Sequence, residues 1–198
     1  MMDDHADGGA YPEKNFKDQT CYVIQTKTGD EDTVIALMNV LAKGFFFEAF
    51  LPKRVMQKKI RGKIKKVTQN IFHGYIFVTT ICPTELFLKL KRVPKLSKLL
   101  CDGEYNFYRL SDAEAQFIMR IGEGRHDHTF GLSLVELNKD VPYKSGDRVK
   151  IISGDLKGFE GEIAYFDIHH RKAAVKTSLF GGTTIHVGIE LLMKDERS

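Results

Sequence analysis

The pattern of apolar and polar positions divides the chain into an N-terminal part of mixed periodicity and a C-terminal part with strand periodicity. "CYVIQTK" at 21–27 has the β-branched and aromatic content of a buried strand. "FFFEAFLP" predicts a short strand that stops at Pro52, and "GYIFVTT", from Gly74, predicts a further strand. The first half of the chain therefore contains several strands of a sheet.

Three segments of the same half have helical spacing. "GDEDTVIALMNVLAKG" repeats apolar residues from Val34 onward and places Gly44 where a left-handed C-cap is expected. "CPTELFLKLKRV" has Pro83 at a plausible helix start, and "LSDAEAQFIMRIGEG" has Ser111 and Glu114 at capping-box spacing. Strands and helices in this order predict an α+β layer, with helices packed against a mostly antiparallel sheet.

The segment "KRVMQKKIRGKIKKV", at 53–67, predicts a long hairpin that turns at Arg61 and Gly62. Residues 53–66 contain eight basic residues and no acidic one. Such a concentration fits phosphate neutralisation, although a solvated loop would have the same composition. The candidate nucleic-acid-binding residues of the hairpin are Lys53, Arg54, Lys58, Lys59, Arg61, Lys63, Lys65 and Lys66.

Short alternating strands fill the C-terminal part. Val149 and Ile151 alternate with basic residues, and Ile185, Val187 and Ile189 alternate with polar ones. Several short strands in about 50 residues predict a small all-β, SH3-like barrel. We therefore expect a disordered leader at 1–20, an α+β domain at 21–122, a linker at 123–142 and the barrel at 143–193.

Composition narrows the function classes. The chain has 198 residues, a net charge of +4 and a hydrophobic fraction of 42%, which is sufficient for a core. No apolar run approaches the roughly 20 residues that span a bilayer, so we expect no membrane partner. The N-terminus lacks the apolar region of a secretory signal, and three cysteines without C-x-x-C spacing indicate reduced thiols in a cytoplasmic protein. No zinc site, cofactor or catalytic motif is recognisable, so the chain is not predicted to be an enzyme.

The stretch "SGDRVKIISGDLKGFEGEIAYFD", at 145–167, has four glycines at strand starts and turns: Gly146, Gly154, Gly158 and Gly161. Glycine at such places indicates tight curvature or positive φ. The stretch resembles the KOW motif of ribosomal proteins and of the NusG family of transcription elongation factors. In the first half, "CYVIQTKTGDE" and "NIFHGYIFV" resemble two elements of the NusG N-terminal (NGN) domain, so the resemblance covers about residues 21–193.

Departures from the family pattern indicate a specialised paralogue of the RfaH or LoaP kind. Cys21 stands where the family usually has tryptophan, and His73 stands where it has proline. Leu156 replaces a phenylalanine that helps housekeeping members contact a ribosomal small-subunit protein. The LoaP-like branch implies antitermination of long operons and a KOW barrel that recognises an RNA hairpin.

The resemblance implies that the NGN domain docks an apolar surface onto the clamp helices of the largest RNA polymerase subunit and meets the gate loop. By position, Tyr22, Phe72, Tyr75 and Ile76 are the expected polymerase-binding residues, although each could instead belong to the core. Lys27 follows the first strand, where specialised relatives touch non-template DNA, but a solvated turn is an equal alternative.

Basic residues of the barrel could form a continuous RNA-binding surface, since loops and backbone contacts are the usual means of reading RNA. The alternatives are a protein partner, such as a ribosomal small-subunit protein, and a purely structural barrel. Adjacent strand residues face opposite ways, so His169 and His170 are not expected to bind a metal. The candidates are Lys144, Arg148, Lys150, Lys157, His169, His170, Arg171, Lys172 and Lys176.

The expected function is that of a transcription elongation factor that binds RNA polymerase, suppresses pausing and promotes processive antitermination. The alternative is a ribosome-associated KOW protein that binds structured RNA and has no polymerase contact.

Overall fold

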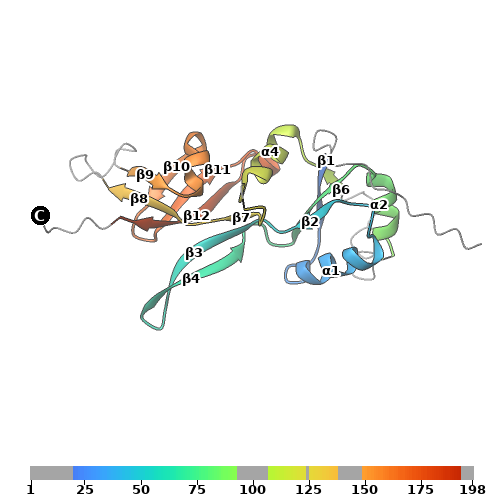
Figure 1. Ribbon diagram of the computed structural model, residues 1–198, viewed down its shortest axis with the longest axis horizontal. Helices are drawn as coiled ribbons and strands as arrows, with labels where there is room; N and C mark the ends of the chain where they lie inside the picture. Colours follow the sequence, from blue (N-terminus) through green and yellow to red (C-terminus); the bar gives the residue numbers. More distant parts are fainter. Residues whose placement is uncertain (1–19, 93–106, 124, 138–148, 193–198) are drawn as a thin grey trace, which may run out of the picture.

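The computed structural model describes residues 20–92, 107–123, 125–137 and 149–192 (Figure 1). They form an N-terminal α+β domain and a C-terminal β domain, which confirms the expected fold class. The N-terminal domain consists of β1 (Thr20–Gln25), α1 (Glu31–Leu41), β2 (Glu48–Phe50), β3 (Lys53–Ile60), β4 (Lys63–Asn70), β5 (Tyr75–Thr80), α2 (Pro83–Leu90), β6 (Phe107–Arg109), α4 (Asp112–Arg120) and β7 (Thr129–Phe130).

The central sheet of the N-terminal domain has the strand order β2-β5-β1-β6, and its strands pair antiparallel. Helices cover the two faces unequally. Ile24, Ile76 and Val78 pack with α1 and α2 on one face, whereas Val23 and Phe77 belong to the cluster that includes α4 and the C-terminal domain. Because neighbouring residues of a strand point to opposite faces, the register of β1 against β5 decides which side chains meet each partner.

The predicted starts of the second and third helices are confirmed. Pro83 lies in the first turn of α2. The Ser111 side chain accepts a hydrogen bond from the Glu114 N–H, and the Glu114 carboxylate accepts one from the Ser111 N–H, which completes the capping box of α4. Within the described residues, no helix is both long and apolar enough to cross a membrane.

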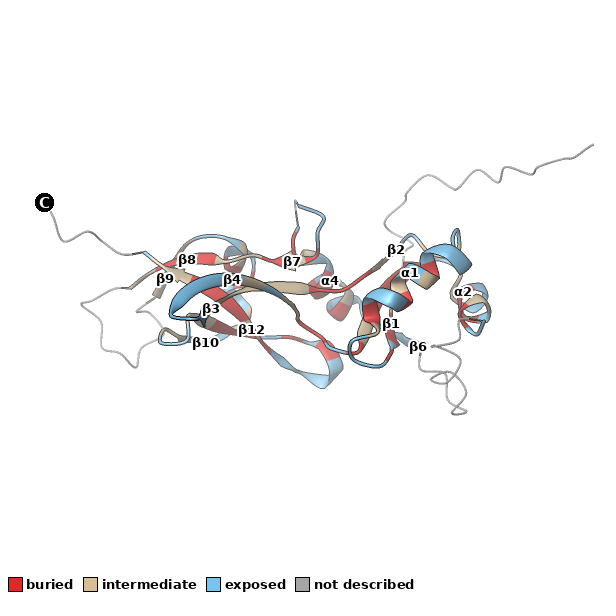
Figure 2. Cartoon of the chain, turned by 90° about the horizontal axis from the view of Figure 1, so that it is seen from below, coloured by how far each residue is buried: buried red, intermediate tan, exposed pale blue. Residues whose placement is uncertain are grey.

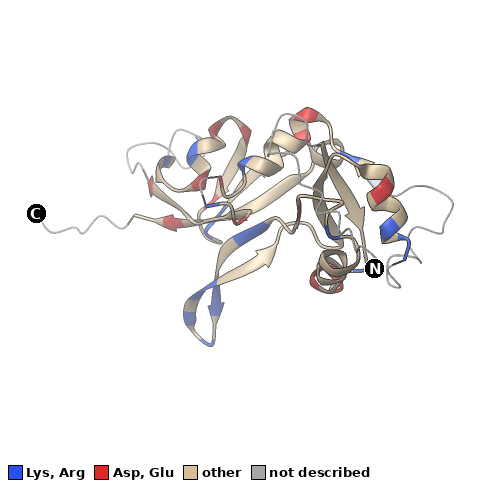
Figure 3. Cartoon of the chain, turned by 45° about the vertical axis from the view of Figure 1, so that its right-hand side comes forward, with Lys and Arg blue, Asp and Glu red and all other residues tan. Residues whose placement is uncertain are grey.

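The predicted basic hairpin is formed by β3 and β4, which pair from Lys53 and Asn70 to Ile60 and Lys63. Arg61 (φ 50°) and Gly62 (φ 80°) make its turn, as the sequence indicates. The distal part of the hairpin projects away from the rest of the chain (Figures 1 and 3).

The C-terminal domain is a five-stranded sheet of order β10-β11-β12-β8-β9. It consists of β8 (Ser133–Leu137), β9 (Val149–Ser153), the 3-10 turns η3 (Asp155–Gly158) and η4 (Glu160–Glu162), β10 (Ile163–Asp167), β11 (Lys172–Lys176), the 3-10 turn η5 (Leu179–Gly181) and β12 (Thr184–Leu191).

The described part of the segment predicted as a linker contains regular structure. It contains β7 and β8, and β8 pairs in parallel with β12 and antiparallel with β9. The apolar alternation of "SLVEL" is too short to separate a barrel strand from an isolated extended segment. The division at 143 stays a prediction, and residues 138–148 lie outside the described residues.

The glycines of the KOW-like stretch have different roles. Gly154 has φ 94°, and a Cβ there would lie 2.6 Å from the Leu132 carbonyl oxygen, so only glycine fits. Gly158 and Gly161 lie in the 3-10 turns η3 and η4, so the predicted tight curvature is present, but neither has a positive φ or a close neighbour at the Cβ position that would require glycine. Gly146 lies outside the described residues.

The two domains share one apolar cluster. Phe117 and Phe130 of the N-terminal domain and Phe159 of the C-terminal domain are buried in it. Figure 2 shows buried stretches on elements of both domains. The ring centroid of Phe159 lies 5.3 Å from that of Phe117 and 5.0 Å from that of Phe130. In Figure 1, α4 lies between the central sheet and the C-terminal strands. The domains therefore pack against each other through a common core.

Candidate functional site

The residues predicted to bind polymerase do not form one surface. Tyr22 lies opposite Val78 in the β1–β5 register and packs with the cluster under α1 and α2. Tyr75 packs with the cluster on the other face, toward the C-terminal domain. Ile76 is fully buried under the helices, so its side chain is not available to a partner and belongs to the core.

Phe180 of the C-terminal domain lies against three aromatic residues of the N-terminal domain. We call these three residues, Phe72, Tyr75 and Tyr108, the aromatic cluster. The Phe180 ring centroid lies 5.0 Å from Tyr75, 5.8 Å from Phe72 and 6.4 Å from Tyr108. Phe72 is only 8% exposed, whereas Tyr108 is 50% exposed. Two of the four predicted residues are thus in contact with one covering side chain.

The turn that carries Phe180 has a constrained backbone. Phe180 has φ 51° and ψ 39°, a left-handed conformation that costs energy for a residue with a Cβ. Gly181 and Gly182 follow with φ values of 79° and 105°. The ring is 38% exposed although it lies against three aromatic side chains. The turn therefore holds Phe180 over the aromatic cluster without sealing it.

Glu114 ties this turn to the N-terminal domain. Its Oε1 accepts a hydrogen bond of 3.2 Å from the Phe180 N–H, and its Oε2 accepts bonds of 2.9 Å and 2.8 Å from the Ser111 N–H and Oγ. Burial alone would raise the pKa of this carboxyl, but the hydrogen bonds from Ser111, Phe180 and Tyr108 outweigh it and hold the pKa below its ordinary value. The contact is therefore built for an ionised carboxylate.

Ion pairs from the C-terminal end of α4 and the segment after it also join the two domains. Arg125 binds Asp155 with two parallel hydrogen bonds of 2.9 Å and 2.7 Å, and the Gly131 N–H donates to the same carboxylate. Burial of Asp155 works against ionisation, but Arg125 and the Gly131 N–H hold its pKa below the usual range. Paired bonds of this kind are the stronger charge-assisted ones.

A second arginine, Arg120 at the end of α4, contacts both a carboxylate and an aromatic ring. The Arg120 guanidinium lies 4.2 Å from the centroid of Phe159, and its Nη1 donates to Glu162 Oε1 at 2.7 Å. Both partners belong to the C-terminal domain. Arg120, Arg125, Tyr108 and Phe180 were not predicted as functional residues. The only signal was local: Phe180 precedes two glycines, which is typical of an exposed turn.

The hairpin is fixed at its base by the C-terminal domain. Arg54 Nη1 donates to the His186 carbonyl at 2.6 Å, and Arg171 Nη1 donates to Gln57 Oε1 at 2.8 Å. Lys66 forms an ion pair of 2.9 Å with Glu190. Beyond these contacts the residues from Lys58 to Lys65 are exposed.

The basic residues predicted for the barrel lie on separate elements. Lys150 and Lys157 are exposed on β9 and η3, whereas His169, His170 and Arg171 lie in the turn between β10 and β11. Residues 144 and 148 lie outside the described part of the chain. The prediction of one continuous surface is thus untested as a whole, and only the turn is joined to the hairpin, through Arg171.

An acidic neighbour pairs with some of these basic residues of the C-terminal domain. Asp167 accepts from the His170 N–H at 3.1 Å, and its Oδ2 lies 2.8 Å from His170 Nδ1 and 3.6 Å from Lys172 Nζ. The His170 N–H and ring hold the pKa of Asp167 below its ordinary value. Lys176 is exposed on β11, and Lys27 is exposed in the turn after β1.

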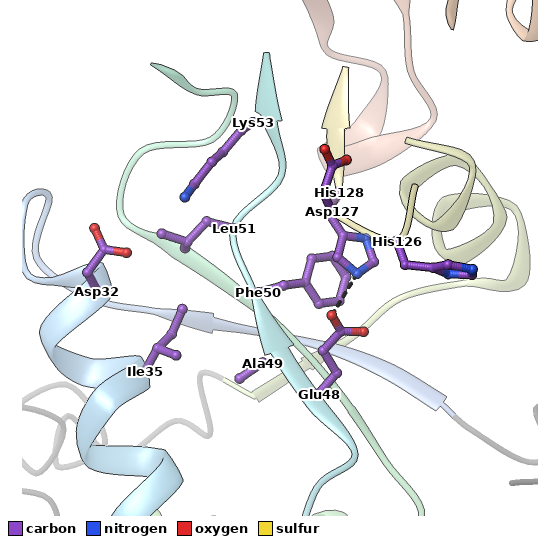
Figure 4. Close-up of a pocket in the computed structure, with 10 residues that line it drawn as sticks. All are labelled: Asp32, Ile35, Glu48, Ala49, Phe50, Leu51, Lys53, His126, Asp127 and His128. Carbon is purple, nitrogen blue, oxygen red and sulfur yellow. Dashed lines mark hydrogen bonds and ion pairs between the residues drawn. The ribbon is translucent and has the colours of Figure 1, made fainter. Parts of the chain in front are cut away.

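A pocket of about 220 Å³ lies where α1, β2, β3 and residues 126–128 meet (Figure 4). His128 Nε2 lies 2.9 Å from Glu48 Oε1, and the imidazole stacks on Phe50 at 3.7 Å between ring centroids. Among the described residues, no group of three or more His, Cys, Asp or Glu side chains could hold a metal ion. The pocket is thus a local packing site, and nothing in its lining defines a catalytic constellation.

The fold and these surfaces define a two-domain protein whose N-terminal α+β domain carries an aromatic cluster and a basic hairpin. A sequence profile described as "Transcription termination factor nusG" matches residues 19–119, which is half of the chain. The chain belongs to the NusG family, whose members are transcription termination and antitermination factors and are not known as enzymes.

Two curated relatives and one solved structure agree with this assignment. The protein is 23% identical to "Transcription termination/antitermination protein NusG" of Helicobacter pylori (strain J99), over 82% of this chain and 90% of the relative. It is 27% identical to the protein of the same name from Lactococcus lactis, over 84% and 88% of the two chains. The structure described as "Domain interaction in Thermotoga maritima NusG" matches with a TM-score of 0.51 and 22% identity, over 86% of this chain and 93% of the other.

Proposed function

We propose that the protein binds RNA polymerase through the aromatic cluster and acts as an elongation factor that suppresses pausing and promotes processive antitermination. The observation that carries the proposal is the grouping of Phe72, Tyr75 and Tyr108 around a single covering ring. Aromatic side chains bury large areas, and tyrosine keeps its hydroxyl satisfied at an interface. A coiled coil such as the polymerase clamp helices is a suitable partner for such a surface.

In the arrangement described here, Phe180 occupies part of that surface. Binding of the clamp helices to Tyr75 and Phe72 therefore requires the η5 turn to leave. A partner that binds only the open arrangement shifts the population toward it, by no more than its difference in affinity for the two arrangements. The C-terminal domain thus acts as a competitor for the polymerase site.

The effect on transcription follows from the same principle. A factor that contacts both the clamp helices and the gate loop binds the closed, elongating polymerase better than the paused one, and so favours elongation without any chemistry. The released C-terminal domain would then recruit RNA or a protein partner, and its attachment to the bound domain raises its effective concentration there. Such a factor would act in the cytoplasm of a bacterial cell.

The experiment that tests polymerase binding is retention of the full chain on immobilised core RNA polymerase. We expect Tyr75→Ala and Tyr108→Ala to reduce retention, because each removes an aromatic ring of the cluster. Tyr165→Ala is the matched control, since Tyr165 is an exposed aromatic residue of β10 that contacts His186 rather than the cluster. Thermal melting shows that each variant is folded.

Two outcomes would overturn the proposal. One is the absence of retention both of the unaltered chain and of the Phe180→Ala variant, in which the ring over the aromatic cluster is removed. The other is equal retention of the Tyr75, Tyr108 and Tyr165 variants. With retention established, transcription across a terminator, with and without the protein, measures whether read-through rises as antitermination requires.

A further inference from the structure

The tip of the β3–β4 hairpin combines basic residues with exposed apolar ones. Ile60 is 39% exposed and Ile64 is 54% exposed, and they are neighbours of the turn at Arg61 and Gly62. Ile60 lies opposite Lys63 and shares a face with Lys58 and Lys65, whereas Ile64 lies opposite Lys59 on the other face. We call residues 58–65 the arm tip.

The charge of the arm tip is not balanced within the described chain. Lys58 lies directly opposite Lys65, and like charges in such pairs destabilise a hairpin. Among the described residues, no carboxylate forms an ion pair with Lys58, Lys59, Lys63 or Lys65, whereas Lys66, nearer the base, pairs with Glu190. An anionic partner with several charges would relieve this repulsion.

The base of the hairpin is rigid. Gly188 of β12 lies so close to β3 that a Cβ there would be 2.4 Å from the Val55 carbonyl oxygen. Gln57 Nε2 donates to Glu190 Oε1 at 2.9 Å, and Arg54 donates to the His186 carbonyl. A ribbon held in this way loses little conformational freedom when its tip binds a partner.

The shape of the arm tip favours one kind of anion. A two-stranded β-ribbon fits the major groove of B-form DNA, which is about 12 Å wide, with phosphates along both walls. The major groove of an RNA duplex is too narrow, and a single strand offers only one line of phosphates. Apolar side chains at the bottom of a DNA major groove can contact thymine methyl groups.

We propose that the arm tip enters the major groove of duplex DNA, with Lys58, Lys63 and Lys65 on the phosphates of both strands and Ile60, on the same face, against the base edges. This inference goes beyond the proposed function and does not depend on polymerase binding. Most of the affinity comes from phosphates, which carry no sequence information. The arm therefore selects a duplex by its shape more than by its sequence.

The first test is binding of the full chain, without polymerase, to a fluorescent 20-base-pair DNA duplex, measured by fluorescence anisotropy at several salt concentrations. The same DNA strand alone and an RNA duplex of the same sequence serve as competitors. We expect the DNA duplex to be the strongest competitor. Equal competition by the single strand or by the RNA duplex would overturn the proposal.

Variants then assign the binding to the arm tip. Lys58→Gln with Lys65→Gln removes two phosphate contacts, so the slope of log K against log salt should fall by about 2. The control, Lys43→Gln with Arg92→Gln, removes the same charge from exposed positions far from the hairpin in sequence and should leave the slope unchanged. A control that lowers the slope as much as the arm variant would show general charge attraction and contradict the proposal.

The isoleucines have their own signature. Ile60→Ser should weaken duplex binding several-fold with the salt slope unchanged, because no phosphate contact is lost, whereas Ile64→Ser, on the opposite face, should have little effect. Methyl green, which occupies the major groove, should displace the chain, whereas netropsin, which occupies the minor groove, should not. Displacement by netropsin alone would exclude the proposed groove. Polymerase retention, measured in parallel, separates failure of this inference from failure of the proposed function.

Discussion

The aromatic cluster and the arm tip differ in how the chain treats them. Tyr75 and Phe72 lie under the Phe180 ring, whereas Lys58 and Lys65 have no ion-pair partner among the described residues. An exposed apolar patch promotes association with any apolar surface, so covering it in the free protein prevents unwanted contacts. Exposed lysines are well solvated and need no cover, and salt screens their attraction. Binding at an apolar surface is thus limited by whether the surface is covered, and binding at a charged surface by the salt concentration.

The largest expected effect on stability comes from weakening the shared core that holds the two domains together. Phe159 is almost fully buried between Phe117, Phe130 and Arg120. We expect Phe159→Ala to lower the free energy of unfolding by about 3–5 kcal/mol, since it leaves a cavity in the shared core. Urea denaturation measures this value. A loss below that of an exposed control such as Tyr165→Ala would show that the two domains do not share a core in solution.

A smaller effect is expected at the ion pair of the interface. Arg125→Gln leaves the carboxylate of Asp155, whose side chain is 15% exposed, without its main partner. We expect a loss of about 1–3 kcal/mol in stability, with faster amide exchange in the η5 turn. Adding Asp155→Asn should recover part of the loss because no buried charge is then left. If the double variant is as unstable as Arg125→Gln alone, the arginine contributes to stability by packing and not by its charge.

Phe180→Ala tests the cover itself. Aromatic pairs contribute about 0.5–1.5 kcal/mol each beyond their burial, so the closed arrangement should become less populated. The apparent affinity for polymerase should rise by about three- to tenfold, since it depends on the competent fraction. DNA binding by the arm tip should stay the same. An equal change at both sites would break the distinction between a covered and an uncovered surface.

The smallest effect is a dependence of the cover on pH. The folded-state pKa of Glu114 lies below its ordinary value of 4.5, so its ionised form stabilises the closed arrangement above that value. The contribution is lost as the pH falls through the lower, folded-state pKa. We expect the protection factor of the Phe180 amide, which corrects for the intrinsic pH dependence of exchange, to fall below about pH 4.5, and Glu114→Gln to reduce this dependence. Asp155 titrates in the same direction and accounts for the part that persists.

The sequence predicted most elements but not the cluster they build. The capping box at Ser111 and Glu114 and the turn at Arg61 follow from local chemistry, and both are present. Tyr22 and Tyr75 were expected on one surface, but the register pairs Tyr22 with Val78 and sends the two tyrosines to opposite faces. A shift of one residue would have reversed this outcome, and periodicity alone does not specify register.

The cover could not be predicted for a related reason. Phe180 and Tyr75 are far apart in sequence, and their contact depends on how two domains pack, which the pattern of either domain does not contain. The basic hairpin, in contrast, could be predicted because its residues are consecutive, and the nucleic-acid contact proposed for it depends on charge. The assignment to a specialised branch of the family also stays a prediction, since it depends on single residues such as Cys21 and Leu156.

The close seat of β12 against the hairpin has one more consequence. The hairpin belongs to the N-terminal domain, but Gly188 of the C-terminal domain packs closely against its strand β3. A movement of that domain away from the proposed polymerase site would also remove this support. In the free protein, β12 would support the hairpin and Phe180 would cover the aromatic cluster. In the bound factor, the hairpin would lack this support and the cluster would be exposed, so one domain movement would change both sites.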